Sequence, residues 1–415
     1  MGGGLLQLVA YGAQDVYLTG NPQITFFKVV YRRHTNFAIE AIQQTFNGNP
    51  GYGNTVTCQI SRNGDLINRM YVQVDIPAVS DVNTQHVNYL GLKLLKSVVI
   101  EIGGQQIDKH YSDWLYIWNE LSLPTGKRGG YDNMVGADGA ATSEKTLYIP
   151  LEFWFCRNVG LALPLIALQY HEVKVKIEFE TKINCVCKIT GEKVTTTDLT
   201  PYSDITNVSL WVDYIFLDTD ERRRFAQLSH EYLIEQLQFT GSDTINKSSS
   251  PDNMKSIRMN FNHPCKELVW TIKRNNTSTH KVFWNNFSSA EGSEGAGNAN
   301  NTMNDYSEST NTTLQAKIML NGNDRFATRK GEYFSLVQPY QHHENTPDEN
   351  HKGINVYSFA LKPEEHQPSG TLNMSRIDTA VLNVSSKVEG TIYVFAVNYN
   401  VLRILSGMGG LAYSN

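Results

Sequence analysis

The sequence predicts an all-β protein built from two similar halves. Aromatic residues, which favour strands, make up 11% of the 415 residues, with 21 Tyr and 17 Phe. Residues 173–180 alternate perfectly between apolar and charged side chains, the pattern of a strand with one buried and one solvated face. The strand patterns of the first half also recur, in the same order, in the second half.

Five short matches define this internal repeat. They are Ile39-Glu40 with Ile234-Glu235, Met70-x-Val72-x-Val74 with Leu268-x-Trp270-x-Ile272, Ile100-x-Ile102-x-Gly104 with Ile318-x-Leu320-x-Gly322, Gly160-x-Ala162 with Gly370-x-Leu372, and Thr206-x-Val208-x-Leu210-x-Val212-x-Tyr214 with Thr391-x-Tyr393-x-Phe395-x-Val397-x-Tyr399. Each match alone is weak, because alternating strands resemble one another. Five matches in one order are hard to obtain by chance, so we expect two copies of one β domain.

The two copies are expected to differ mainly in their loops. The offset between matched segments rises from 198 to 218 residues and later falls from 210 to 185. The rise assigns about twenty extra residues to the second copy, in the Asn-, Ser- and Thr-rich segment 275–313. The fall assigns a longer loop to the first copy, at residues 181–205. Loops of such length in compact domains are usually functional or disordered.

The repeat also sets the expected domain boundaries. These are an N-terminal arm at residues 1–24, a first domain at 25–217, a linker at 218–228 and a second domain at 229–415. The arm is Gly-rich and only mildly apolar, so a neighbour is needed to hold it. The linker is expected to contain a short helix, with Asp218, Thr219 or Asp220 available as its N-cap.

In the first copy we expect a hairpin and one clear helix. Thr55 to Ile60 and Met70 to Ile76 have strand patterns, and Asn63-Gly64-Asp65 between them is a hairpin signal. The helix is indicated by apolar residues at helical spacing, namely Ile107, Tyr111, Trp114, Leu115, Trp118 and Leu121. Such an aromatic stripe is more often core packing than a ligand platform. The Gly-rich residues 124–145 are expected to form a loop.

In the second copy the stretch from Ala316 to Asp378 is expected to form two strands and a corner. The strands are an apolar one at 318–320 and an extended segment at 354–359, with prolines and glycines where the chain must bend. Nothing in this stretch arranges a nucleophile, a base and an orienting group. We therefore expect no catalytic residue, no cofactor and no bound metal.

Composition and charge exclude several classes of protein. The net charge of −5 gives no basic field, so direct binding of nucleic acid is not expected. Five cysteines are few and odd in number, which favours free buried or half-buried thiols over a disulfide framework. No apolar run approaches the roughly 20 residues of a membrane helix, and we expect no secretory signal at the N-terminus.

Antiparallel copies with about eight strands and long corner loops suit a jelly roll. Two in tandem resemble the major capsid proteins of nucleocytoplasmic large DNA viruses, the double jelly-roll family, and its algal phycodnavirus-like branch in particular. The segments that carry this resemblance, from the first residues to the last strand, are Gln14 to Lys28, Tyr31-Arg32-Arg33, Asn321 to Phe326, Gln338 to His343 and Phe359 to Thr371. The implied fold is two tandem eight-stranded antiparallel jelly rolls with a few short helices in the connecting loops.

The resemblance implies a structural role and no enzyme activity. Three copies would form a homotrimer whose six barrels give a pseudo-hexagonal capsomer, and capsomers would tile the icosahedral shell of the virion after assembly in the host cytoplasm. Neighbouring capsomers, minor capsid proteins and penton proteins are the implied partners, with the inner viral membrane touched at most indirectly. We expect the outer surface to be built from residues 275–313, 124–145 and 341–352, and the arm to lie at the inner base.

Members of the algal branch carry glycans on outward loops, at Asn residues that need not follow the usual sequon. Sequons occur in segment 275–313, although an Asn-, Ser- and Thr-rich loop produces them by chance as well. The resemblance therefore makes Asn276, Asn286 and Asn311 the candidate attachment sites.

Two alternatives share the jelly roll. A cupin-type enzyme needs clustered metal ligands, and the only candidates are His342, His343, Glu344 and His351. Adjacent histidines on a strand point to opposite faces, so they are poor joint ligands. A carbohydrate-binding lectin is the second alternative, supported by the aromatic-rich loops. A lectin would bind sugars, whereas a capsomer would run as a stable trimer and polymerise.

Overall fold

Strands dominate the computed structural model, which contains two compact units, Met1–Asn36 and Phe37–Asn415. The described residues are 3–79, 81, 83–139, 143–188, 194–275, 284–289, 311–347 and 353–413. All pairings between the named strands are antiparallel. Among the described residues, no helix has the length and apolar character needed to cross a bilayer.

The first unit has no core of its own. It contains the short helices α1 (Gly3–Val9) and α2 (Val16–Thr19), followed by chain without regular structure up to residue 36. Its described residues are all exposed except the half-buried Asp15, and large apolar side chains such as Tyr17, Phe26 and Phe27 are among them. Helices this short are unstable in water unless packing supports them.

The first half of the larger unit folds into a five-stranded and a four-stranded main sheet. Sheet 1a has the order β1 (Phe37–Gln44), β11 (Thr206–Leu217), β3 (Leu66–Ile76) and β7 (Lys145–Pro150), with β8 (Leu163–Pro164) also on β3. Sheet 1b has the order β2 (Thr55–Gln59), β9 (Val173–Phe179), β5 (Leu95–Ile102) and β6 (Gln105–Tyr111). Strands close in sequence thus alternate between sheets, as a jelly roll requires.

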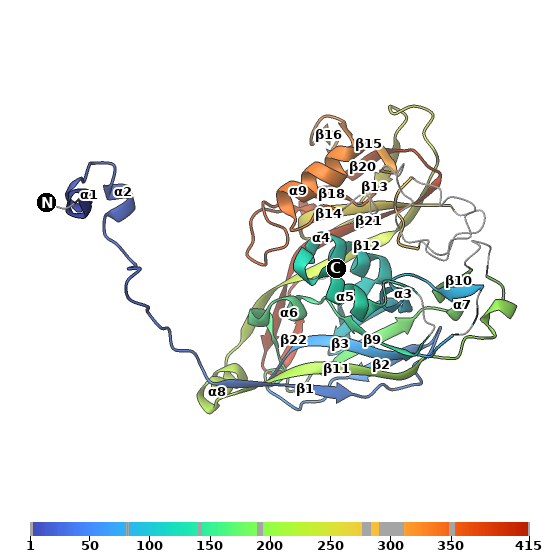
Figure 1. The fold of residues 1–415 in the computed structure, drawn as a ribbon, viewed down its shortest axis with the longest axis horizontal. Coiled ribbons are helices and arrows are strands. Elements are labelled where there is room, and N and C mark those ends of the chain that lie inside the picture. The colour runs from blue at the N-terminus through green and yellow to red at the C-terminus, as the bar shows by residue number, and fades with distance from the viewer. Residues whose placement is uncertain are drawn as a thin grey trace. The chain divides into compact units, whose positions relative to one another are not determined.

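The second half repeats this order strand for strand. Sheet 2a has the order β12 (His230–Ile245), β21 (Gly390–Leu405), β14 (Pro264–Arg274) and β18 (Asn355–Ser358), with β19 (Leu372–Asn373) on β14 and β22 (Met408–Leu411) on β21. Sheet 2b has the order β13 (Lys255–Arg258), β20 (Ala380–Ser386), β15 (Thr313–Leu320) and β16 (Asn323–Asp324), with β17 (Arg329–Lys330) on β15. Figure 1 shows the two sets of sheets, with α4 between them.

The remaining elements lie in the connections. Helical segments are α3 (Leu90–Leu94), α4 (Ser112–Ser122), η1 (Thr125–Lys127), α5 (Arg128–Val135), α6 (Trp154–Arg157), η2 (Val159–Leu161), α7 (Lys182–Cys185), η3 (Thr197–Leu199), α8 (Thr219–Gln227), η5 (Tyr333–Val337), α9 (Gln338–His342) and η7 (Met374–Arg376). A two-stranded sheet pairs β4 (Thr84–His86) with β10 (Val186–Lys188). Of the three candidate caps, Asp218 caps α8, its side chain accepting a hydrogen bond from the Thr219 amide.

All five sequence matches fall on corresponding elements of the two rolls. They pair β1 with β12, β3 with β14, β5 with β15 and β11 with β21, and the glycine match precedes β8 and β19, which pair with the equivalent strands β3 and β14. The prediction of two antiparallel jelly rolls in tandem is therefore confirmed.

The last match identified the right strand in a register that is wrong by one residue. Val72 pairs with Leu210 in sheet 1a, and its counterpart Trp270 pairs with Val394 in sheet 2a. Leu210 thus corresponds to Val394, not to Phe395. The register shift between Thr206 and Ser209 causes the slip, since Thr206 and Thr391 still lie opposite the equivalent residues Asp75 and Lys273. A slip of one residue turns a side chain to the opposite face.

The predicted hairpin at Asn63-Gly64-Asp65 is wrong, although both of its strands exist. β2 pairs with β9 in sheet 1b, whereas β3 pairs with β11 and β7 in sheet 1a. The turn therefore carries the chain from one sheet to the other. Local turn chemistry cannot distinguish these cases, because sheet membership is decided by partner residues at least 69 positions away, as for Ile76 and Lys145.

The helix prediction needs two corrections. α4 begins at Ser112, so Ile107 and Tyr111 belong to β6. Residues 125–135 of the predicted loop are helical, as η1 and α5, because the apolar Tyr131 and Val135 are buried. Gly136, with φ of 72°, ends α5, and a left-handed residue of this kind commonly terminates a helix.

The corner of the second roll is also helical. The segment that leads to His342-His343 forms η5 and then α9, so the two histidines end a helix and do not lie on a strand. The strands expected at 318–320 and 354–359 correspond to β15 and β18. Helices therefore connect the same pair of strands in both rolls: α4 and α5 in the first, η5 and α9 in the second.

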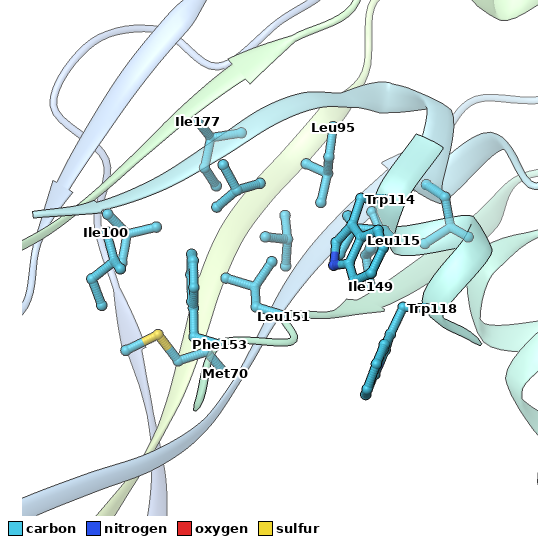
Figure 2. Packing of buried hydrophobic residues seen from close by; sticks show 14 of the residues in the cluster. Met70, Leu95, Ile100, Trp114, Leu115, Trp118, Ile149, Leu151, Phe153 and Ile177 are labelled. Atoms are coloured by element: carbon cyan, nitrogen blue, oxygen red, sulfur yellow. The ribbon is translucent and has the colours of Figure 1, made fainter. Parts of the chain in front are cut away.

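The core of the first roll lies between sheets 1a and 1b. Figure 2 shows Met70 and Ile149 of sheet 1a near Leu95, Ile100 and Ile177 of sheet 1b. Burying one side chain of this size contributes roughly 1.5–3 kcal/mol. A separate cluster fills the second roll between sheets 2a and 2b. The five cysteines are free thiols, four buried and Cys156 half-buried, as predicted.

Candidate subunit interface

Helix α4 packs the first roll against the outer face of sheet 2a. Trp114, which is buried, has its ring 5.5 Å from that of Phe395 on β21. Val269 on β14 and Ile354, just before β18, belong to the same hydrophobic cluster as the core of the first roll. The contact between the rolls is therefore a continuation of a core and not a contact between two solvated surfaces.

Polar groups fix the orientation of this contact. Lys273 on β14 binds Asp113 on α4, with Nζ and Oδ1 2.5 Å apart. Burial lowers the pKa of Lys273, and the Asp113 carboxylate opposes that shift. The Leu237 amide donates to Asp108 Oδ1 at 3.0 Å, and Gln236 Nε2 donates to the Ile107 carbonyl. These bonds tie β12 of the second roll to β6 of the first.

A buried charged cluster lies beside α4. Glu235 on β12 binds Lys266 Nζ at 2.7 Å and Arg157 of α6 at 3.3 Å, and the Arg157 guanidinium stacks 4.0 Å from the centre of the Trp118 ring. Burial alone would raise the pKa of Glu235. The His366 imidazole 3.6 Å away and the charges of Lys266 and Arg157 outweigh burial and lower this pKa to about 2. Glu235 is therefore an anion that links both rolls.

His343 is held between two carboxylates. Its Nε2 lies 2.8 Å from Glu267 and its Nδ1 lies 2.7 Å from Glu364, while the imidazole side chain is fully buried. Burial opposes the charged form, but the two carboxylates outweigh it and raise the pKa of His343 to about 9. Both ring nitrogens of His343 contact a carboxylate, so His343 is the centre of an ion-pair cluster. His351, the other candidate metal ligand, lies outside the described residues.

The C-terminal strand β22 fastens the second roll to the first. His171 Nδ1 lies 2.8 Å from the Gly409 carbonyl oxygen, and the Tyr170 amide donates to the Gly407 carbonyl at 3.0 Å. A Cβ on Gly409 would come within 2.6 Å of Leu168. The absence of a side chain at Gly409 therefore leaves room for the side chain of Leu168.

Two apolar patches among the described residues of the larger unit are accessible to solvent. One is an aromatic patch on sheet 1a formed by Tyr71, Tyr148 and Trp211, in which Tyr71 lies 6.1 Å from Tyr148 and 6.3 Å from Trp211 between ring centres. The other, the corner patch, surrounds η5 and α9 and consists of Leu336, Val337, Tyr340 and Leu361, all exposed. Exposed clusters of large apolar residues commonly mark interaction sites.

The predicted outer segments and glycan sites are only partly described. Segment 275–313 is described at residues 275, 284–289 and 311–313, so Asn276 lies outside the described residues. Asn286 is half-buried, and its Oδ1 accepts a bond from the Ser288 amide. Asn311 is buried, with Nδ2 donating to Gly331 and Asn355, so a glycan there would displace both bonds.

Sequence reasoning missed most residues of the interface. Glu235 entered only as part of a repeat match, and Lys266, His343 and the aromatic patch were given no role as partners. A buried lysine has no local signature, because its partner Glu235 lies 31 residues away. The alternation of β14 offered one usable signal, since Lys266 and Glu267 interrupt an otherwise apolar strand.

Two family models match the chain, one for each roll. The model described as major capsid protein N-terminus matches residues 25–218, and the model described as large eukaryotic DNA virus major capsid protein matches residues 221–410.

Curated relatives match over the whole chain. The major capsid proteins of Pyramimonas orientalis virus and Paramecium bursaria Chlorella virus 1 are 53% and 48% identical, and each alignment covers 100% of both proteins. A chain of the quasi-atomic PBCV-1 virus capsid superposes with a TM-score of 0.81 at 42% identity, covering 94% of this chain and 100% of that one. The Faustovirus major capsid protein shares the fold at 15% identity, with a TM-score of 0.74 and coverage of 95% and 94%.

Two rolls of one topology, joined through a buried helix, define a double jelly-roll shell protein. The chain belongs to the family of major capsid proteins of large eukaryotic DNA viruses. Its place is therefore the capsid shell of the virion, and its role is structural and not enzymatic. These matches give no support to the carbohydrate-binding alternative.

We expect the stability of the subunit to fall between pH 6.5 and about 9 because of His343. Its pKa is higher in the folded chain than the ordinary 6.5, so its ion pairs stabilise fully below pH 6.5 and are lost as pH rises through about 9. The loss should be on the order of 3 kcal/mol. Urea unfolding at pH 6 and pH 9 measures it.

The control for this prediction is His343→Gln, which should be less stable at pH 6 but lack this loss at higher pH. His34→Gln, at an exposed histidine just before β1, should behave like the wild type. An equal pH dependence in wild type and His343→Gln would contradict the assignment.

Proposed function

We propose that this protein is the shell-building subunit of a homotrimeric capsomer. The observation that carries the proposal is the packing of two topologically equivalent rolls within one chain, with α4 as the joint between them. Three copies then supply six equivalent rolls around one axis, which gives a building block with a hexagonal outline. Such blocks tile a surface with few kinds of contact.

The charged and apolar contacts between the rolls support a rigid building block. A subunit that tiles a shell must keep the angle between its two rolls fixed, because small errors accumulate over many copies. The Glu235 cluster, the Lys273–Asp113 pair and the β22 contact all cross from one roll to the other. Contacts of this kind fix geometry even where their net contribution to stability is small.

The proposed domain division places the first roll at residues 25–217, the α8 linker at 218–228 and the second roll at 229–415. Residues 275–313, 124–145 and 341–352 are proposed to contribute to the outer surface, and neighbouring capsomers to be the lateral partners. Minor capsid and penton proteins are further proposed partners, and contact with the inner viral membrane is indirect. Direct binding of nucleic acid is not part of the proposal, given the net charge of −5.

The N-terminal arm is proposed to lie at the inner base of the shell. Its exposed apolar residues, such as Leu6, Leu8 and Tyr17, need a covering surface. An arm of this character suits contact with minor capsid proteins or neighbouring capsomers.

Purified protein should be trimeric, and electron microscopy should show particles with a hexagonal outline. Light scattering gives the mass of the assembly, and the expected value is three times the 46.7 kDa of the chain. A stable monomer at high concentration, or a dimer, would contradict the proposal.

Removal of residues 1–24 should leave the trimer intact and impair assembly of shells. The reason is that the arm has no buried residue in the chain itself, so its loss costs the folded subunit little. Trimer mass and shell yield are the two measurements. A control chain with Tyr11→Ser and Tyr17→Ser, which keeps the arm but removes its two exposed aromatic groups, should show a milder loss. Dissociation of the trimer on deletion would argue against this role.

Glycan attachment is proposed at Asn286 and at Asn276. Protein from virions should then exceed 46.7 kDa by intact mass, and Asn286→Gln should remove one increment of mass. Asn253→Gln, at an exposed Asn outside any sequon, serves as the control. An unmodified mass would remove the proposal, and a modified Asn311 would require attachment before the chain folds around it.

A further inference from the structure

We infer that the corner patch of one copy docks on the aromatic patch of the next copy, repeating between chains the contact that α4 makes within the chain. This inference rests on the proposed trimer and names the two surfaces that close it. The occupant of each patch is therefore a second copy of this chain.

The aromatic patch occupies the same place on sheet 1a as a covered patch on sheet 2a. Strand pairing sets the correspondence, because Tyr71 pairs with Trp211 just as Val269 pairs with Phe395. The third member, Tyr148, lies opposite Gln73, and the equivalent position in the second roll is Ile354. The three residues of the first roll thus correspond, in order, to Val269, Phe395 and Ile354.

The two equivalent patches differ in what covers them. Val269, Phe395 and Ile354 are each no more than 1% exposed, because the first roll with its α4 packs against them. Their counterparts on sheet 1a are more accessible, because Tyr148 is 39% exposed and Tyr71 and Trp211 are half-buried. Trp211 Nε1 is buried without a hydrogen-bond acceptor among the described residues. A surface with this composition is incomplete in the isolated chain.

The corner patch is the counterpart of α4. Both connect the same two strands of their rolls: α4 follows β6 and precedes β7, while η5 and α9 follow β16 and β17 and precede β18. α4 has nine buried residues because the second roll covers it. On η5 and α9, by contrast, Leu336 is 45% and Tyr340 81% exposed. The helix that forms the joint in the first roll is therefore uncovered in the second.

Charges near the two patches are complementary. Asp75 on sheet 1a stands where Lys273 stands on sheet 2a, since each follows the third residue of its matched strand triplet. The chain entering η5 carries the exposed Arg325, Arg329 and Lys330, whereas α4 carries Asp113. Within the chain, the sheet carries the cation and the helix carries the anion. Between copies, the sheet carries the anion and the chain entering η5 carries the cations, so opposite charges face each other in both contacts. Binding of α4 to sheet 1a, or of the corner patch to sheet 2a, would bring like charges together and is therefore disfavoured.

The docking is heterologous, because the two patches are different surfaces of the chain. Heterologous contacts form a closed ring when the rotation between copies allows it. Each chain then contributes one internal joint through α4 and one external joint through the corner patch, which makes six joints for three copies.

Cross-linking tests the contact directly. In Tyr148→Cys/Tyr340→Cys, a short bis-maleimide should join chains into products of two and three on a denaturing gel, and none larger. A mixture of the two single variants should give products of two chains at most, because each chain then carries only one of the two thiols. The wild type, with four of its five thiols buried, is the control for background reaction.

A charge in the corner patch should weaken the trimer. Tyr340→Asp should raise the trimer dissociation constant at least tenfold, and Tyr17→Asp, at a similarly exposed tyrosine of the N-terminal arm, should leave it unchanged. Both sites are exposed, so both variants should fold, and circular dichroism checks this.

The outcomes separate this inference from the proposed function. A wild-type trimer that gives no cross-linked product, or that tolerates Tyr340→Asp as well as Tyr17→Asp, overturns the docking of these patches and leaves the capsomer proposal standing. A wild type that is monomeric overturns both. Cross-linked products from either single variant alone would indicate a symmetric contact and also overturn the inference.

Discussion

The packing of α4 against sheet 2a is the contact on which the architecture depends. It turns two jelly rolls, each with a core between its own sheets, into one unit, because Trp114 and Phe395 place the outer face of sheet 2a inside the hydrophobic cluster of the first roll. Apolar burial is not directional, so the orientation of the rolls is set by the polar bonds around it. Lys273 with Asp113 and Leu237 with Asp108 supply that direction.

The buried ionic groups gather beside this joint. Glu235 contacts cations from both rolls, and His343 is enclosed by Glu267 of β14 and Glu364. Taking charges out of water is costly, and the cost is offset only when each charge has partners in good geometry. In any other arrangement of the rolls, these buried charges would lose their partners and that arrangement would be unfavourable. Their main effect is therefore on the orientation of the rolls and less on stability. That property suits a subunit which must present the same shape in every copy of a shell.

The duplicated fold also explains why the two rolls have different surfaces. Sheet 2a meets a partner within the chain and carries aliphatic residues and Phe395 on its outer face. Sheet 1a carries Tyr71, Tyr148 and Trp211 at the equivalent positions, side chains that combine apolar area with a polar group. Tyr and Trp tolerate water before assembly and become buried afterwards, which is the chemistry of interfaces. The connecting helices differ in the same way, because α4 is mostly buried within the chain whereas η5 and α9 carry exposed apolar residues.

The sequence by itself determined that the chain is a duplicated β protein, because alternation and the order of strands are local properties that survive in a list of residues. It placed the five repeat matches on the right elements and gave the cap of α8, and its resemblance to the capsid family was correct. Only the tertiary structure decided that β2 and β3 belong to different sheets, that β11 and β21 correspond with a shift of one residue, and that His343 lies between two carboxylates. Each of these depends on partners distant in sequence, such as Glu267, 76 residues from His343. Sheet membership, register and ion pairing are settled by long-range packing, which periodicity in a single strand does not encode.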